Sequence, residues 1–217
     1  MARVVSFLLT VLVSVNLASV NLAMADGEAG DFDYYVLALS WSPTWCALEG
    51  DAQDAEQCDE GKDYGWVMHG LWPQYDDGWP SFCRTTFRAP SRGETGAMAD
   101  IMGSGGSAWH QWKKHGVCSG LSPQDYYRLA RLAYENVIRP PVLRKLDDPV
   151  RVPAKVIEEA FLQSNPDWQA NMITITCKSD RIQEARLCLT RDLEPRKCGR
   201  DTIRDCSATR ALLDPVR

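Results

Sequence analysis

The sequence predicts a single α+β domain, in which an antiparallel β-sheet is packed with helices and stabilised by disulfides. Three observations support this fold class: segments typical of strands occur near both ends of the chain, segments typical of helices lie between them, and eight cysteines are spread along it. At 217 residues the chain is long enough for one domain with a sizeable core. It contains no internal repeat and no low-complexity tract.

The first 25 residues have the pattern of a signal peptide. Arg3 supplies a positive start, residues 4–20 are almost wholly apolar, and small residues stand at Ala23 and Ala25. Two asparagines interrupt the apolar run, which disfavours a membrane-spanning helix of about 20 residues. We therefore expect cleavage after Ala25 and a secreted or periplasmic protein with no membrane partner.

The cysteines all follow this leader, and their number is even. They are Cys46, Cys58, Cys83, Cys118, Cys177, Cys188, Cys198 and Cys206. In an exported chain this pattern indicates four disulfides, although eight cysteines by themselves allow 105 pairings. No Cys-x-x-Cys pair occurs, which argues against a thiolate metal site.

The charge of the chain limits how it can bind a polyanion. The formal net charge is −5, and removing a leader with one Arg and no acid makes it −5 − 1 = −6. Proteins that bind nucleic acid through their overall charge are usually basic. A polyanionic partner must therefore meet a local cationic groove.

The first half of the chain predicts two strands separated by loops. Residues 33–41 are rich in aromatic and branched side chains, as in a buried strand. An acidic stretch at residues 49–63 predicts a solvated loop, and residues 65–71 predict a second strand that stops before Pro73. Residues 74–106 are rich in Gly, Pro, Ser and Asp, so we expect a long loop.

The second half predicts three helices and a strand pair. Residues 107–115 predict a short helix capped by Ser107. A helix starting after Ser122 and ending before Pro140, and another over residues 153–163, follow from Ser-Pro capping and apolar spacing. Residues 172–178 and 185–190 alternate as strands, which we expect to pair across residues 179–184.

Histidine occurs at only two places in the sequence. His69 lies in one Gly- and Trp-rich segment, and His110 and His115 lie in another beside Lys114. On a helix His110 and Lys114 share one row, and Gln111 and His115 share the next. One neutral and one cationic imidazole can take and give protons, while a lysine stabilises developing negative charge. The combination is typical of phosphodiester cleavage by an internal hydroxyl.

Two other interpretations compete with this one. Isolated histidines are often ordinary core residues, and paired lysines often mark a solvated helix face. A zinc helix is disfavoured because His110 and His115 are five residues apart and Gln111 stands where the zinc motif has Glu. The two neighbouring lysines would also repel a dication.

These segments resemble a known family. His69-Gly70-Leu71-Trp72-Pro73 and the run from His110 to Cys118 are similar to the two active-site segments of the ribonuclease T2 family. The upstream segment Leu39-x-Trp41-x-Pro43-x-x-Cys46 is also similar, and the resemblance extends from about Tyr34 to Cys206. The family fold implied for residues 26–217 is a ribonuclease T2-like catalytic domain of the α+β class.

The resemblance implies an endoribonuclease that cleaves single-stranded RNA, with low base specificity, through a 2′,3′-cyclic phosphate to 3′-phosphate ends, without metal or cofactor. His115 would be the base and His69 the acid, while His110 and Lys114 would hold the phosphate. Trp72 would stack on a base. DNA lacks the attacking hydroxyl and would not be cleaved. We expect a monomer.

Several residues remain open within this interpretation. Gln74 and Trp112 are further candidates for binding substrate, and Tyr75 and Trp79 are either base-stacking residues or ordinary loop anchors. Gln111 stands where the family usually has Glu, so it is a catalytic-site residue with one negative charge fewer. We expect that loss to lower the pKa of His115, to change the pH optimum and to slow turnover.

The missing carboxylate keeps a second function open. Gln111 makes a non-catalytic exported RNA-binding relative conceivable, although retention of His69, His110, Lys114 and His115 favours an enzyme. A metal-dependent phosphodiesterase is a third possibility, and EDTA would abolish its activity. The family pattern also implies disulfides between Cys46 and Cys58, Cys83 and Cys118, Cys177 and Cys206, and Cys188 and Cys198.

Overall fold

The computed structural model describes residues 27–217. The expected signal peptide and its cleavage point after Ala25 lie outside the described residues. Among the residues described, no helix is long and apolar enough to cross a membrane.

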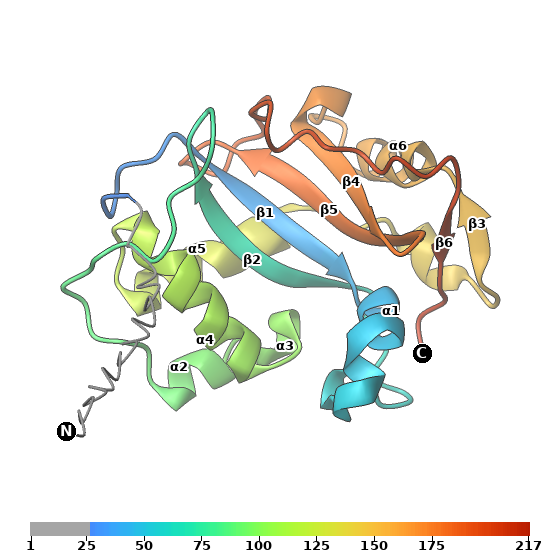
Figure 1. Cartoon of the computed structure of the whole chain (residues 1–217), viewed down its shortest axis with the longest axis horizontal. Coiled ribbons are helices and arrows are strands. Elements are labelled where there is room, and N and C mark those ends of the chain that lie inside the picture. The colour runs from blue at the N-terminus through green and yellow to red at the C-terminus, as the bar shows by residue number, and fades with distance from the viewer. Residues whose placement is uncertain (1–26) are drawn as a thin grey trace, which may run out of the picture.

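One six-stranded sheet forms the centre of the molecule (Figure 1). The strands are β1 (Tyr34–Trp41), β2 (Trp66–Gln74), β3 (Val150–Val152), β4 (Ile173–Lys178), β5 (Arg181–Leu189) and β6 (Ala211–Leu213). They follow the order β2-β1-β5-β6-β3, and β4 pairs with β5. All pairs are antiparallel except a short parallel pairing of β5 with β6. The predicted α+β class is confirmed.

Two predicted strand boundaries were wrong. β2 continues through Pro73 because it lies at the end of the strand order, where a missing N–H removes no bond to a neighbouring strand. β5 begins at Arg181 rather than residue 185, since Ser179 and Asp180 both adopt positive φ (51° and 56°) and reverse the chain in a tight turn.

Within residues 27–217, six α-helices pack around the sheet. They are α1 (Ser42–Trp45), α2 (Arg92–Gly96), α3 (Ala99–Met102), α4 (Gly105–Lys114), α5 (Pro123–Asn136) and α6 (Ala154–Ser164). In Figure 1, α2 to α5 gather on the side of β1 and β2, and α6 lies near β4. The predicted loops at residues 49–63 and 74–106 therefore contain structure: short helical turns in the first, and α2, α3 and the start of α4 in the second.

Serine caps define the starts of α2, α4 and α5. α4 begins after Ser104, whose Oγ accepts a hydrogen bond from the backbone N–H of Ser107 at 3.0 Å. The prediction that Ser107 is the cap was therefore wrong, because the chain is already helical at Gly105. Ser122 does cap α5, as predicted, by accepting from the N–H of Asp125.

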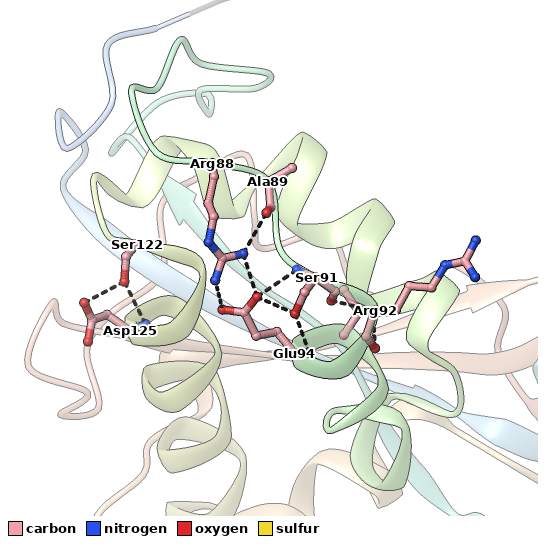
Figure 2. Close-up of polar contacts among 8 residues, drawn as sticks. Arg88, Ala89, Ser91, Arg92, Glu94, Ser122 and Asp125 are labelled. Carbon is pink, nitrogen blue, oxygen red and sulfur yellow. Dashed lines mark hydrogen bonds and ion pairs between the residues drawn. The ribbon is translucent and has the colours of Figure 1, made fainter.

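α2 has a complete capping box that Figure 2 shows in detail. Ser91 Oγ accepts from the N–H of Glu94 at 3.2 Å, and Glu94 Oε2 accepts from the N–H of Ser91 at 2.7 Å. Arg88 holds the same carboxylate with two bonds of 2.8 Å. The Ser-x-x-Glu pattern was present in the sequence, and the helix prediction missed it.

Four disulfides connect the elements with the pairing that the family resemblance implies. They join Cys46 to Cys58, Cys83 to Cys118, Cys177 to Cys206, and Cys188 to Cys198. Cys118 lies in the short helical turn Gly116–Ser119 that comes after α4, so its bond to Cys83 fixes the end of the histidine-bearing segment. Cys188 lies in β5, so its bond anchors the segment after Cys198 to the sheet.

Candidate active site

The two histidine segments meet at one cavity, which we call the first cavity. Its volume is about 380 Å³, and it is lined in part by His69, Trp72, His110, Gln111, Lys114 and His115. β2 supplies the first two of these side chains, α4 the next three, and His115 follows the last turn of α4. The sequence prediction that these residues act together is consistent with this grouping.

A bulge in β2 brings His69 to the first cavity. The pairing of β1 with β2 passes from Ala38–Gly70 to Leu39–Met68, so His69 has no opposite residue. In a regular strand, residues three apart point to opposite faces. The extra residue changes this alternation, and both His69 and Trp72 therefore line the cavity.

His69 is held by a carboxylate that the sequence analysis missed. Its Nδ1 lies 2.5 Å from Oε1 of Glu184, a residue 115 positions away on β5 whose side chain is 3% exposed. Arg186 donates two hydrogen bonds, of 2.9 and 2.8 Å, to the other carboxylate oxygen. Burial by itself would raise the pKa of Glu184, but the bond and charge of His69 and the Arg186 guanidinium outweigh it and hold this pKa at about 2. Glu184 is therefore ionised.

The environment of His115 disfavours the charged form of its ring. The residue is 6% exposed, and its Nδ1 has no hydrogen-bond partner among the described residues. Burial, followed by the charges of Lys114, His69 and His110, lowers its pKa from 6.5 to about 3. His115 is therefore neutral across the physiological range. Gln111 is not among these causes, so its predicted effect on the pKa of His115 stays a prediction.

Trp72 connects the two histidines. Its ring stacks on His115, with centroids 5.1 Å apart and an interplanar angle of 27°, and meets the His69 ring edge-on at 5.2 Å. Its Nε1 donates to Oε1 of Gln111 at 2.8 Å. Arg186 lies 5.5 Å from the ring centroid. Stacking of a base on Trp72 stays a prediction.

Gly70 lies where a larger residue would displace this arrangement. A Cβ atom at Gly70 would come within 2.3 Å of Trp72 Nε1 and 2.5 Å of Gln111 Oε1. Such distances are far below van der Waals contact, so any side chain here would separate the two groups. The Gly in the His-Gly-Leu-Trp segment is therefore required by the packing of the site.

The remaining predicted residues divide between the site and the core. Gln74 and Trp79 line the first cavity, with Gln74 buried and donating through Nε2 to the carbonyl of Pro73. Trp112 does not line it: the side chain is buried against Tyr126, with ring centroids 5.7 Å apart. The structure therefore places Trp112 in the core, because its direction on α4 faces the core, and gives no support to the prediction that it binds substrate.

A second cavity of about 520 Å³ adjoins the first. His69, His110 and Gln111 line both cavities, whereas His115 and Lys114 line only the first. His69 thus lies between two spaces, each of the size of a small-molecule site.

Fold and site together define a disulfide-stabilised α+β protein with one neutral and one carboxylate-bound histidine on a single cavity. The chain belongs to the ribonuclease T2 family, whose model matches residues 32–198.

Curated relatives carry related segments. A ribonuclease of Aeromonas hydrophila is 44% identical over 110 residues, covering 51% of this chain and 48% of that protein. A probable ribonuclease of Haemophilus influenzae is 34% identical over 107 residues, covering 44% of this chain and 39% of that protein. The chain thus spans about half the length, or less, of these curated relatives.

Solved structures share the fold at low identity. An RNase-related protein from Calystegia sepium superposes with a TM-score of 0.66 at 21% identity, covering 84% of this chain and 97% of that one. RNase NT, in a complex with 5′-AMP, gives a TM-score of 0.56 at 19% identity, with coverage of 86% and 100%.

Proposed function

We propose that this protein is an endoribonuclease that cleaves single-stranded RNA by transesterification, without a metal ion or cofactor. The product would be a 2′,3′-cyclic phosphate that is then hydrolysed to a 3′-phosphate. The observation that carries this proposal is the pair of differently held histidines on one cavity: His115 neutral, and His69 bound to an ionised carboxylate. Such a pair supplies one proton acceptor and one proton donor.

His115 is the proposed base. Because its pKa lies near 3, it is neutral at any working pH and has a lone pair for the 2′-hydroxyl proton. A bound phosphate brings an anion next to the imidazole, which favours the protonated ring as the reaction proceeds. The low pKa of the free protein therefore does not prevent proton transfer in the complex.

His69 is the proposed acid, and Glu184 determines which nitrogen acts. With Nδ1–H donating to the carboxylate, Nε2–H is left to protonate the leaving 5′-oxygen. After this transfer Nδ1 keeps its hydrogen and Nε2 has a lone pair. His69 can then take a proton from the water that opens the cyclic phosphate, while His115 returns its proton.

The position of the two histidines orients the substrate. His115 borders only the first cavity, so the nucleoside whose 2′-hydroxyl attacks occupies that cavity. His69 borders both cavities, so the leaving nucleoside occupies the second. Lys114 and His110 lie at the first cavity and would together bind the phosphate that joins the two nucleosides. DNA lacks the attacking hydroxyl and would remain intact.

We further propose export of the mature chain, residues 26–217, as a monomer after removal of the leader. The four disulfides support this proposal, since such bonds persist in secreted and periplasmic proteins.

The test is cleavage of a short single-stranded RNA by the purified mature protein in EDTA between pH 4 and 8. Mass spectrometry of the ends should find cyclic and 3′-phosphates, and a DNA strand of the same sequence should stay intact. His69→Ala and His115→Ala should abolish cleavage, while Lys155→Ala on the exposed face of α6 should not.

Three other outcomes would contradict the proposal. Loss of activity in EDTA would indicate a metal-dependent phosphodiesterase. RNA that binds but stays intact at every pH would indicate the non-catalytic binding protein. Full activity in either histidine variant would remove that histidine from the mechanism.

A further inference from the structure

We propose that Asp201 reads the base held in the first cavity, so that the protein prefers adenine, cytosine or guanine over uracil on the 5′ side of the cleaved bond. The inference rests on the proposed function and deepens it. Its basis is a carboxylate on the first cavity in which one oxygen accepts a hydrogen bond and the other has no donor.

One oxygen of Asp201 is satisfied and the other is not. Oδ2 accepts a hydrogen bond from the N–H of Gly78 at 3.0 Å. Oδ1 is buried and has no hydrogen-bond partner within the described part of the chain. A buried carboxylate oxygen without a donor is unfavourable, so the site favours a ligand that brings an N–H to this position.

The segment around Asp201 is held rigidly. Tyr34 on β1 accepts from the N–H of Gly199 at 3.1 Å and bonds to the hydroxyl of Thr202 at 2.8 Å. The disulfide from Cys198 to Cys188 ties the same segment to β5. The carboxylate is therefore fixed before a ligand arrives, which reduces the entropy lost on binding.

A stacking surface lies on the same cavity. Trp79 follows Gly78 directly, lines the cavity, and is 49% exposed. Its ring gives a base a face to stack on, while Asp201 can meet the edge of that base. The hydrogen bond between Gly78 and Asp201 joins the two segments that carry these groups.

Asp201 differs from the other carboxylate that lines this cavity. Glu184 is engaged by His69 and Arg186, so it has little capacity left for a ligand. Asp201 has no ion-pair partner among the salt bridges of residues 27–217. Within the lining of the first cavity it is thus the carboxylate without a cationic partner.

The chemistry of the bases sets the direction of the preference. An ionised carboxylate only accepts hydrogen bonds. Adenine, cytosine and guanine each carry an exocyclic amino group, and carboxylates accept from such groups in base recognition. Uracil has no amino group, and carbonyl oxygens flank its single ring N–H. These oxygens would face the anionic oxygen of Asp201 and weaken binding.

The experiment uses DNA strands that contain one ribonucleotide, so that the proposed chemistry can cut at one position only. The ribonucleotide is adenosine, cytidine, guanosine, uridine or inosine, and the strands are otherwise identical. We expect kcat/KM to be roughly tenfold higher for each amino-bearing base than for uridine. Guanosine should exceed inosine, which lacks its amino group.

Asp201→Asn tests the residue itself. Asparagine keeps the size and one oxygen for the N–H of Gly78, but puts an amide donor in place of the oxygen that has no partner. The preference over uridine should disappear or reverse. Asp76→Asn is the matched control, because Asp76 is a neighbouring exposed carboxylate outside the cavity lining, paired with Arg196. It removes the same charge and should leave the order of substrates unchanged.

The outcomes separate the two proposals. Equal cleavage of uridine and the amino-bearing bases, or an order unchanged by Asp201→Asn, would overturn the role of Asp201 and leave the ribonuclease standing. Cleavage of none of these strands, with an all-RNA strand also intact, would overturn both. Equal thermal unfolding of wild type and Asp201→Asn would exclude a folding defect as the cause of any change.

Discussion

His69 and His115 have the same side chain but opposite surroundings. His69 is partly exposed and lies against an ionised carboxylate, whereas His115 is buried among cationic groups. Environments that differ in this way assign acid and base roles to residues of one type. The proposed mechanism therefore depends on the neighbours of each histidine as much as on the histidines.

Gln111→Glu tests the electrostatic environment of His115. A carboxylate at this buried position would favour protonated His115 and raise its pKa from about 3. The acidic limb of the kcat/KM profile should therefore move to higher pH. Gln124→Glu, on the exposed start of α5, makes the same charge change and should leave the profile as it is. An identical profile for Gln111→Glu would show that the position does not control the base.

Glu184→Gln tests how His69 is held. The change keeps the shape but removes the charge, so Nδ1–H is no longer fixed as the donor. We expect kcat to fall by about tenfold or more, with little change in KM, because a positioned general acid contributes roughly 10²- to 10⁴-fold. Glu135→Gln, on the exposed face of α5, should have no effect.

Nitrogen NMR of His69 adds a measurement that a general loss of structure would not reproduce. In wild type the ring should keep the tautomer with Nδ1 protonated, and in Glu184→Gln it should populate both. Unchanged kcat together with an unchanged tautomer would remove Glu184 from the mechanism.

Among the helices and strands, the contact between β2 and α4 determines the geometry of the candidate site. The bulge at His69 and the missing side chain at Gly70 let the strand present Trp72 to Gln111 on the helix. The cap at Ser104 sets where α4 starts, and Cys118 anchors the chain after it. The helix is thus fixed at both ends relative to the strand.

Gly70→Ala should disrupt this contact. The new methyl group would overlap Trp72 Nε1 and Gln111 Oε1, and overpacking of this kind typically costs about 1–3 kcal/mol. We expect lower kcat/KM and a lower free energy of unfolding, both measured in the same buffer. Gly96→Ala in α2 is the control: no atom lies within 4 Å of its Cβ position, so the variant should be as active as wild type.

At the scale of the whole molecule, one sheet and four disulfides hold residues from distant parts of the sequence around two cavities. β5 is central to this arrangement, because it pairs with β1, β4 and β6 and carries both Glu184 and Arg186. The chain is acidic overall, but Lys114 lines the first cavity together with His69 and His110, and the carboxylate of Glu184 there is engaged by His69 and Arg186. Lys114 is therefore the lysine that this cavity offers to a polyanion.

The stability of the fold should fall in acid. His115 has a folded pKa near 3 and an ordinary value of 6.5, so between these values the unfolded chain binds more protons than the folded one. The free energy of unfolding should therefore be about 2.5 kcal/mol lower at pH 4.5 than at pH 7, from about 1.4 kcal/mol per pKa unit. Glu184, with a folded pKa near 2, adds a loss of the same sign below its ordinary 4.5.

Urea unfolding at both pH values measures this effect. His115→Gln cannot titrate at this position and should show a smaller difference between pH 7 and pH 4.5. The same pH dependence in wild type and His115→Gln would contradict the low folded pKa of His115.

The sequence was enough to predict the fold class and the family, and it predicted a site at His69, His110, Lys114 and His115, which the fold brings to one cavity. Short-range patterns suffice for these, because strand and helix periodicity and the two motifs lie within a few residues of each other. The sequence analysis chose Ser107 and not Ser104 as the cap of α4, because serines so close together are equally good candidates for a cap. The pairing of the cysteines followed from the family resemblance.

Which groups set the charge and orientation of those residues could be seen only once the chain was folded. Glu184 meets His69 because β1 pairs with both β2 and β5, across 115 residues that no local pattern spans. The segment that carries Asp201 is held beside the first cavity by a disulfide and by a hydrogen bond to the hydroxyl of Tyr34. Trp112 lies in the core because of its direction on α4. Charge and burial depend on neighbours in space, and the packed sheet alone brings those neighbours together.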